Sequence, residues 1–312
     1  MSWSFSNDRK FRACQRQWYF STIVANHAAA DPQRKHAYLL SKLQGLPVWR
    51  GSLIDYVLSE KVIKGMVGRQ LPTLDETIRF ARTTFEEQVV FARAHRLREP
   101  GMVPSRYPGA FAAWHDKEYD KDVTDDDLKT CWTEIVLCLT NFYAMPEVLT
   151  ELTSALRCIP QRPLTFELHG HSVRATPDLI LFRRQQPPLI FDWKVYRKDS
   201  RDHRLQLACY ALALTRCKPH QDFPALMARV QPTDIQLAEV QLLTKKQRVY
   251  MLSDDDCAET EDFIMQSANA MHIALDALPR KTIDPTRFPA ALSPSTCAFC
   301  QFKLLCWEDP CP

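Results

Sequence analysis

Several features are missing from this 312-residue chain, and each absence narrows the class of protein. No apolar run approaches the length needed to cross a bilayer, so we expect no membrane partner. The first residues, MSWSFSNDRKFRACQ, lack the apolar core of a secretory signal, and we therefore expect an intracellular, cytoplasmic protein. The net charge is only +3, so any contact with nucleic acid must come from local patches and not from a global field.

The bulk composition is that of a globular protein. Hydrophobic residues make up 46% of the chain and charged residues 25%, which is the usual balance of a soluble protein. A length of 312 residues allows one large domain or two ordinary ones.

Cysteine is abundant, but its pattern points away from disulfides. The eleven cysteines are odd in number and no secretory signal precedes them, which argues against a disulfide framework. Five of them lie in apolar helical or strand-like surroundings and are predicted to be small core residues: Cys131, Cys138, Cys158, Cys209 and Cys217.

The cysteines near the C-terminus form the strongest local pattern. Cys297, Cys300 and Cys306 have the spacing C-x2-C-x5-C, which predicts a shared metal or cluster centre in a reducing compartment. Two completions are open. Cys311 would complete a local four-cysteine zinc knuckle, whereas Cys14 would tie the two ends of the chain together and would suit a 4Fe–4S cluster.

The stretch from Ala175 to Lys194 predicts two short strands joined by a turn. Leu179–Phe182 and Leu189–Phe191 are apolar runs, and the polar, proline-containing segment 183–188 separates them. Short apolar runs that are interrupted by proline indicate buried strands.

Charged residues border both of these strands. Asp178 precedes the first and Asp192 follows the second, and Lys194 emerges from the same strand face as Asp192. Two carboxylates and an ammonium at a sheet edge suit phosphodiester hydrolysis, because the acids can hold a divalent cation and the lysine can orient or deprotonate the attacking water. The alternative is a solvated hairpin that carries ordinary charges.

Further polar candidates lie on predicted helices. Asp55 is on the apolar side of a helix over Trp49–Leu58, where a carboxylate needs a cation, a donor or a metal; a structural salt bridge is the simpler interpretation. Gln206 and Tyr210 are one turn apart on a helix over Arg201–Arg216, so both face the same way. They could meet the lysine, a phosphate or a nucleotide, or lie at the rim and in the core.

The remaining patterns predict helices in the first half of the chain and a mixture of strands and helices in the second. Helices are expected within 72–100 and 124–157, with Thr124 or Asp125 as cap and a break at Pro146, and from Ser253 or Asp254 to about Leu278. Strands are expected at Leu164–Gly170, Ile235–Leu243 and Arg248–Leu252. Strands on both sides of a crossover helix predict an α/β or mixed α+β core.

In their order along the chain, these motifs resemble the PD-(D/E)XK nuclease superfamily, and more narrowly its iron–sulfur branch. That branch includes the CRISPR-adaptation exonucleases and the nuclease domains of RecB- and AddB-type helicase–nucleases. The matching positions are Cys14-Gln15-Arg16-Gln17-Trp18-Tyr19-Phe20, Gly51–Asp55, Asp178, Asp192-Trp193-Lys194, Gln206, Tyr210 and the triplet Cys297, Cys300 and Cys306. Gln15 stands where the branch has proline, and Asp55 stands where it has histidine.

The resemblance implies a restriction-endonuclease-like core, with a central mixed sheet flanked by helices and a helical N-terminal half. It also implies that Asp178, Asp192 and the backbone carbonyl of Trp193 hold Mg²⁺ or Mn²⁺. Asp55 would take the place of the metal-binding histidine, as a harder ligand that either suits Mg²⁺ better than Mn²⁺ or binds a second ion.

Roles for the remaining motif residues follow from the same resemblance. Lys194 would position the nucleophilic water and stabilise developing negative charge, with Gln206 and Tyr210 also in the catalytic site. Cys14, and not Cys311, would be the fourth ligand of a structural 4Fe–4S cluster that clasps the termini together, with zinc as the alternative metal.

The expected organisation is an N-terminal strap at 1–25, a helical region at 26–160, a nuclease core at 161–278 and a cysteine segment at 279–312. All four are expected to belong to one nuclease domain.

The leading functional hypothesis is a metal-dependent DNA nuclease that acts on single-stranded DNA or DNA ends. DNA is the expected partner, together with a helicase or another protein. The alternative is a catalytically silent DNA-binding or scaffold subunit of a helicase or defence complex, and RNA is a further candidate substrate. DNA repair, CRISPR-type adaptation and phage defence would each accommodate such a chain.

Overall fold

The computed structural model describes residues 1–66, 70–97, 99, 102–195, 202–276, 283–291 and 293–307. The chain divides into two units, each assembled from segments that are far apart in sequence. The first consists of Met1–Phe5, Arg50–Thr83 and Thr130–Ser267, and the second of Ser6–Trp49, Thr84–Lys129 and Ala268–Pro312. The predicted division at residues 25, 160 and 278 stays a prediction.

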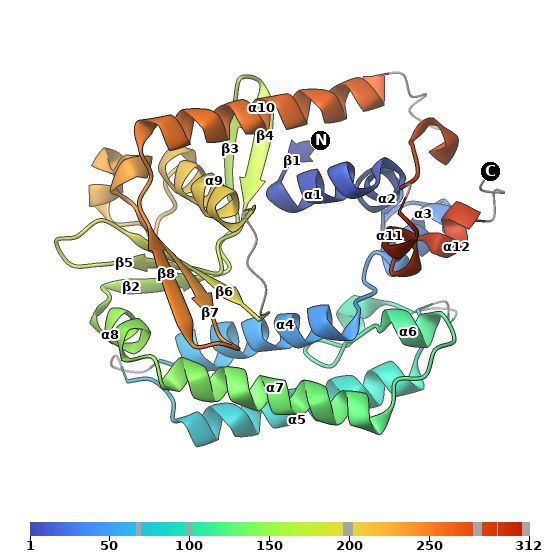
Figure 1. Cartoon of the computed structure of the whole chain (residues 1–312), viewed down its shortest axis with the longest axis horizontal. Helices are drawn as coiled ribbons and strands as arrows, with labels where there is room; N and C mark the ends of the chain where they lie inside the picture. Colours follow the sequence, from blue (N-terminus) through green and yellow to red (C-terminus); the bar gives the residue numbers. More distant parts are fainter. Residues whose placement is uncertain are drawn as a thin grey trace. The chain divides into compact units, whose positions relative to one another are not determined.

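A five-stranded mixed sheet organises the first unit (Figure 1). Its strands, in spatial order, are β2 (Arg157–Pro160), β5 (Leu179–Phe182), β6 (Leu189–Lys194), β7 (Gln236–Gln241) and β8 (Lys246–Tyr250). β6 and β7 run parallel, whereas the other neighbouring pairs are antiparallel. Nearly every side chain of β5, β6 and β7 is buried, which is why β5 and the first half of β6 appear in the sequence as continuous apolar runs.

A second, three-stranded sheet has the order β1 (Ser2–Trp3), β4 (His171–Ala175) and β3 (Leu164–Leu168). β1 runs parallel to β4, and the buried indole of Trp3 donates from Nε1 to Oγ of Ser267 at 2.9 Å. The sequence did not predict β1, because two residues show no periodicity and their pairing partners lie about 170 positions away.

Helix α9 (Asp202–Arg216) is the crossover between the parallel strands β6 and β7, and it packs against both of them. The same helix contacts β3 and β4 of the smaller sheet (Figure 1). Its apolar side chains are almost completely buried, including Leu207, Ala211 and Leu212. A parallel pair requires a long crossover, and here that crossover presents polar residues of α9 to the strands.

Capping boxes begin three long helices, α5 (Leu74–Ala94), α7 (Asp125–Tyr143) and α10 (Asp254–Asp276). In each, a hydroxyl accepts from the backbone N–H three residues later, and the carboxylate there accepts from the N–H of the hydroxyl residue, at 2.8–3.2 Å. The pairs are Thr73 with Glu76, Thr124 with Asp127 and Ser253 with Asp256. The predicted helix starts near Thr124 and Ser253 are therefore confirmed.

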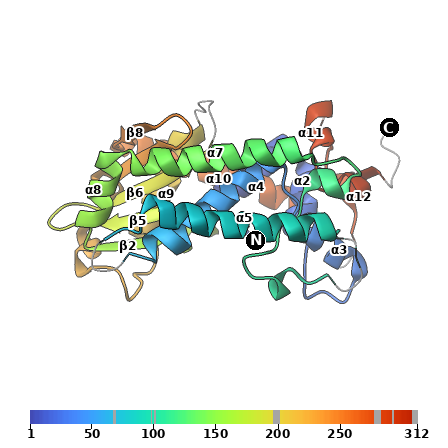
Figure 2. The ribbon, with the colours of Figure 1, turned by 90° about the horizontal axis from the view of Figure 1, so that it is seen from below.

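Helices α5 and α7 lie side by side (Figure 2). Within the first unit, Oγ1 of Thr77 and the hydroxyl oxygen of Tyr143 are 2.8 Å apart, and the Arg82 guanidinium lies 4.8 Å from the ring centroid of Trp132. Helix α8 (Pro146–Ser154) begins at the proline that was expected to break this region. No single described helix has both the length and the apolar character to cross a membrane, and α7 with α8, bent by 65°, meets that test only as a pair.

The described part of the second unit is built mainly of helices. It contains most of α1 (Phe5–Ala13) and all of α2 (Gln15–Tyr19), α3 (Pro32–Leu40), α6 (His115–Glu118), α11 (Pro294–Ala298) and α12 (Lys303–Trp307). Helices α1 and α2 are separated at Cys14, which has an extended conformation with φ −164°. Stacking of Tyr19 on Phe288, with ring centroids 4.2 Å apart, joins the start of this unit to its C-terminal segment.

Phe142 supports the sheet from α7. Its ring is fully buried and lies edge-on to the ring of Trp193, with centroids 5.8 Å apart. We expect Phe142→Ala to lower the free energy of unfolding by about 3–5 kcal/mol, because it leaves a cavity against the strand. Val249→Ala, at a half-exposed position of β8, should change it by less than about 0.5 kcal/mol. Chemical denaturation of both variants measures the difference, and equal losses would contradict this assignment of the core.

Candidate active site and cysteine pocket

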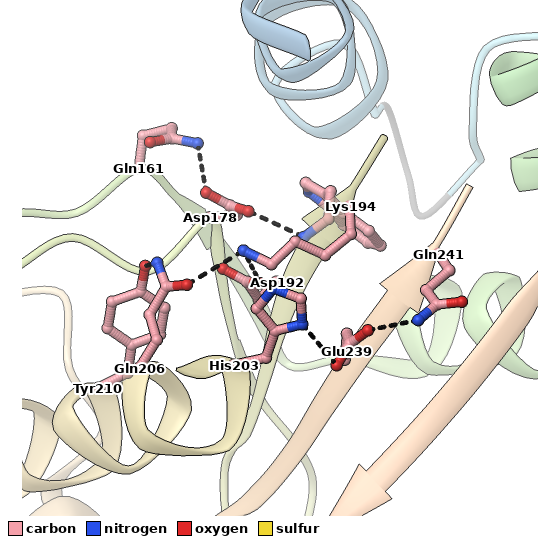
Figure 3. Close-up of polar contacts among 10 residues, drawn as sticks. Gln161, Asp178, Asp192, Lys194, His203, Gln206, Tyr210, Glu239 and Gln241 are labelled. Carbon is pink, nitrogen blue, oxygen red and sulfur yellow. Dashed lines mark hydrogen bonds and ion pairs between the residues drawn. The ribbon is translucent and has the colours of Figure 1, made fainter. Parts of the chain in front are cut away.

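The antiparallel pairing of β5 and β6 brings two carboxylates to one edge of the sheet. Leu179 pairs with Phe191 at the end of the ladder, so the next facing positions are Asp178 and Asp192. Oδ2 of Asp178 accepts a hydrogen bond from the backbone N–H of Trp193 at 2.8 Å (Figure 3). A side-chain oxygen thus continues the pairing beyond the last backbone partner, and it fixes the orientation of Asp178.

Lys194 connects the acids to helix α9. Its ammonium forms an ion pair with Oδ2 of Asp192 and donates to Oε1 of Gln206 at 3.1 Å. The side-chain amide of Gln206 in turn donates to the hydroxyl of Tyr210 at 2.6 Å (Figure 3). The four residues that the sequence placed on a strand and on a helix therefore form one continuous polar chain.

Helix α4 (Leu46–Val57) carries Asp55, the third carboxylate of the candidate site. Burial, followed by the negative charge of Asp192, raises the pKa of Asp55 to about 7, while Lys194 acts in the opposite direction. Because the charges of Asp192 and Lys194 both act on it, Asp55 belongs to the same electrostatic cluster as the strand residues.

The surroundings of Asp178 and Asp192 also disfavour the ionised forms of their carboxyl groups. Burial, then the charges of Asp192 and Asp55, raises the pKa of Asp178 well above its usual value, against the opposing effects of Lys194 and the Trp193 N–H. Burial likewise raises the pKa of Asp192, although Lys194 opposes it. Asp192 is only 1% exposed, so it is a buried group and not the open sheet-edge charge that the sequence suggested. When all three carboxylates are ionised, their combined negative charge exceeds the single positive charge of Lys194.

The three carboxylates are ligands of the type that binds a hard divalent cation. Three carboxylates whose pKa values are all raised, with burial as the largest cause, are stabilised when a divalent ion replaces their protons, and oxygen ligands are those that Mg²⁺ and Mn²⁺ prefer. In the described parts of the chain, however, no three His, Cys, Asp or Glu side chains are arranged to hold a metal. Asp192 is paired with Lys194 instead. The backbone carbonyl of Trp193 stays a predicted ligand.

Arg50, on the same helix as Asp55, was not singled out by sequence. Its guanidinium is buried, donates to the backbone oxygen of Val195 at 2.8 Å and forms an ion pair with Glu134. Val195 directly follows Lys194 at the end of β6. Arg50 therefore ties the helix that carries Asp55 to the strand end that carries the lysine.

Gln161 is another residue that sequence reasoning missed. Its side-chain amide donates to Oδ1 of Asp178 at 3.2 Å, and its backbone N–H donates to the Asp178 carbonyl at 3.0 Å. Gln161 adopts φ +48°, a left-handed conformation that is uncommon for a residue with a side chain. No periodicity in the sequence marks such a position, so only the fold reveals it.

Three buried polar residues lie beside the predicted site and were also missed: His203 from α9, and Glu239 and Gln241 from β7. Nδ1 of His203 lies 3.3 Å from Oε2 of Glu239, and Gln241 donates to Oε1 of Glu239 at 2.6 Å (Figure 3). One sequence signal could have identified the strand residues. Glu239 and Gln241 are two positions apart in an otherwise apolar strand, which places both on one face.

The second unit contains the predicted cysteine set. Cys14, Cys297, Cys300 and Cys306 line one pocket, together with the buried ring of Phe302. Burial raises the pKa of Cys300 to about 12, and the other three thiols add to this effect. None of the described cysteines forms a disulfide. Cys311 lies outside the described residues.

Hydrogen-bond donors already point at three of these four sulfurs. The Gln17 N–H lies 3.4 Å from Sγ of Cys14, and the Phe302 N–H lies 3.4 Å from Sγ of Cys300. Nη1 of Arg16 donates to Sγ of Cys306 at 3.6 Å. Such contacts stabilise negative charge on sulfur, so the chemistry of these thiols fits a metal or cluster, although the four described thiols, like the carboxylates, are not arranged as an assembled metal site.

Of the cysteines predicted to be core residues, four are buried: Cys131, Cys138, Cys209 and Cys217. Cys158 is only partly buried, because it lies on β2 at the edge of the sheet.

A central mixed sheet flanked by helices, with acids and a lysine at the ends of β5 and β6, defines a restriction-endonuclease-like fold. The chain belongs to the PD-(D/E)XK nuclease superfamily, whose family model matches residues 2–307. Its class is therefore that of the nucleases, and its substrate is nucleic acid.

Two solved structures share similarity over most of the chain. The crystal structure of SSO0001 covers 75% of this chain and 98% of that protein, with 11% identity and a TM-score of 0.31. The crystal structure of a candidate exonuclease from Eubacterium rectale covers 82% and 96%, with 10% identity and a TM-score of 0.30. Similarity at this level carries no functional argument. No curated protein matches the sequence.

The raised pKa of Asp55 predicts how stability depends on pH in the metal-free protein. Its folded-state pKa of about 7 exceeds the ~3.9 of an unfolded chain, so stability falls as pH rises from about 4 to about 7. Asp55→Asn removes this cost. In EDTA, we expect the variant to be more stable than the parent at pH 8, with a smaller difference at pH 5.5.

Denaturation curves at the two pH values measure this effect. Added Mg²⁺ should stabilise the parent more than the variant. An Asp55→Asn variant that is less stable than the parent at pH 8 would show that Asp55 is a favourably paired structural acid.

Proposed function

We propose that this protein is a divalent-metal-dependent deoxyribonuclease that acts on single-stranded DNA or DNA ends. The observation that supports this most is the polar chain from Asp192 through Lys194 to Gln206 and Tyr210, with Asp178 at the position that faces Asp192 on the neighbouring strand. Carboxylates that need a cation, next to a lysine held at a fixed position, are what phosphodiester hydrolysis requires.

The proposed metal ligands are the side chains of Asp55, Asp178 and Asp192 and the backbone carbonyl of Trp193. When bound, Mg²⁺ or Mn²⁺ would polarise the phosphate and lower the pKa of a coordinated water. Asp55 in place of a histidine makes the ligand set entirely oxygen, which favours Mg²⁺. Release of Asp192 from its ion pair with Lys194 would accompany metal binding, since the described side chains do not already form a metal site.

The protein's own groups have separate roles in this proposal. Lys194, once released from Asp192, orients the attacking water and stabilises negative charge on the phosphate. Gln206 holds the ammonium at 3.1 Å, and Tyr210 fixes the amide of Gln206. Gln161 and the Trp193 N–H hold the two oxygens of Asp178 in position.

A structural 4Fe–4S cluster is the second element of the proposal, and with it membership of the iron–sulfur branch. Its ligands would be Cys14, Cys297, Cys300 and Cys306, which line one pocket with N–H donors to three of the sulfurs. Its proposed role is to join the N-terminal strap to the C-terminal tail. Zinc is the alternative occupant.

A catalytically silent DNA-binding or scaffold subunit of a helicase or defence complex is the alternative function. Two observations favour it: aspartate at position 55, and the absence of an assembled metal-ligand group among the described side chains. Binding of DNA without cleavage of any strand form, in either metal, would support this alternative.

Lys194→Ala and Asp192→Asn should reduce cleavage by at least about a hundredfold, because each removes charge at the reacting phosphate or its metal. Asn is chosen at position 192 because the carboxylate is buried and Asn keeps its shape. Lys246→Ala, at an exposed position of β8, is the matched control and should cleave normally. The assay uses labelled single-stranded, duplex and forked DNA, and RNA, with Mg²⁺ and Mn²⁺. Full activity of Asp192→Asn would disprove the site assignment.

Anaerobically purified protein should contain about four iron atoms per chain and absorb visible light, as a 4Fe–4S cluster does. Cys14→Ser should lose iron, whereas Cys311→Ser should retain it. Iron analysis and the visible spectrum measure both outcomes. A colourless protein with stoichiometric zinc would refute the cluster, and loss of metal in Cys311→Ser alone would reverse the choice of the fourth ligand.

A further inference from the structure

The buried pair of His203 and Glu239 has no part in the roles assigned so far. His203 is 6% exposed and Glu239 is 1% exposed, and Nδ1 of the imidazole lies 3.3 Å from Oε2 of the carboxylate. Buried charged groups cost free energy unless they are paired, and replacing such a pair by apolar residues is often neutral or stabilising. Stability alone therefore does not explain why this pair is here.

Its position relative to the proposed catalytic residues suggests a reason. The parallel register pairs Asp192 with Glu239 and Lys194 with Gln241. Because side chains alternate along a strand, these four residues emerge on one face of the sheet, the face that meets His203 from α9 (Figure 3). Glu239 is thus the neighbour of Asp192 on the next strand.

One oxygen of Glu239 accepts a hydrogen bond from β7, and the other faces His203. Gln241 donates to Oε1 of Glu239 at 2.6 Å, and Oγ1 of Thr244 donates to Gln241 at 3.1 Å. Arg248 is the residue paired with Glu239 on β8. Although burial acts to raise it, the bonds from His203 and Gln241 and the charges of His203 and Arg248 lower the pKa of Glu239. A carboxylate only accepts hydrogen bonds, so Nδ1 of His203 carries the proton in this contact.

Asp192 is within electrostatic reach of the same imidazole. Asp192 is the residue paired with Glu239 across β6 and β7, and Oε2 of Glu239 lies 3.3 Å from Nδ1 of the imidazole. Lys194 already pairs with Oδ2 of Asp192, so an imidazole that paired directly with Asp192 would be a second competitor for the oxygens that the metal needs. The contact with Glu239 directs the Nδ1–H of His203 to β7 instead.

We propose that Glu239 is a positioning residue that anchors His203 on β7, and thereby keeps Asp192 available to a divalent cation. The inference rests on the proposed function, because it assumes that Asp192 is a metal ligand. In this proposal, His203 and Glu239 increase the affinity for the metal, and this role is separate from any contribution to the stability of the fold.

The test is Mn²⁺ binding to the metal-free full chain, measured by isothermal titration calorimetry. Glu239→Gln frees the imidazole, so we expect about tenfold weaker binding, equivalent to ~1.4 kcal/mol. The double variant Glu239→Gln/His203→Leu removes the competing donor, and its affinity should return to within about threefold of the parent, a strongly non-additive result. Glu167→Gln, at an exposed position of β3, is the control and should bind normally.

Each outcome decides the question. Unchanged affinity in Glu239→Gln would refute the anchor, and weak binding that persists in the double variant would make Glu239 itself a metal-binding group. If the parent protein binds no Mn²⁺ and cuts no DNA, the proposed function falls, and this inference falls with it. If Glu239→Gln does not fold, His203→Leu alone is informative: it should bind Mn²⁺ as tightly as the parent, and a tenfold loss would overturn the proposal.

Discussion

Repulsion between like charges in a partly buried space is the constraint on which the rest of this structure depends. The antiparallel register of β5 and β6 makes Asp178 and Asp192 facing neighbours, and α4 adds Asp55 to the same cluster. At low effective dielectric, such charges interact far more strongly than they would in water. The surrounding structure supplies cations and donors to compensate, and each compensating group holds one of the acids in a defined orientation.

The compensating groups come from elements that are distant in sequence. The crossover helix α9 exists because β6 and β7 are parallel, and it supplies Gln206 to Lys194 and His203 to Glu239. The β2–β3 connection supplies Gln161 to Asp178. The order of the strands therefore determines which polar groups surround the acids. A different strand order would remove the hydrogen-bond donors and positive charges that stabilise these buried carboxylates.

The second unit meets a different chemical demand. Its four thiols are the proposed soft ligands of a metal or cluster, and the donors to them come largely from backbone N–H groups of short helices and turns, with Arg16 as the charged exception. Arg16 is itself fixed by the carbonyls of Phe288 and Pro289, at 3.1 and 3.3 Å. The sulfur pocket is thus organised by residues near both ends of the chain, whereas the carboxylate cluster is organised by the sheet.

Local patterns predicted much of the fold and the candidate residues. The strands beside Asp178 and Asp192, the capped helices and the one-turn spacing of Gln206 and Tyr210 all depend on short-range periodicity, and the structure contains each of them. The pairing of β1 with β4, the left-handed Gln161 and the contact of His203 with Glu239 depend on long-range packing. No property of the individual segments specifies such contacts, and the burial of Asp192 was missed for the same reason.

Trp193 belongs both to the core and to the sheet edge of the proposed active site. Its ring stacks on Phe191 at 5.2 Å and meets Phe142, while its backbone N–H binds Asp178 and its neighbours in sequence are Asp192 and Lys194. A change of core volume that moves this ring also moves the strand on which the acid and the lysine are fixed. A substitution in this aromatic cluster is therefore expected to displace the proposed site residues even where the fold itself is retained.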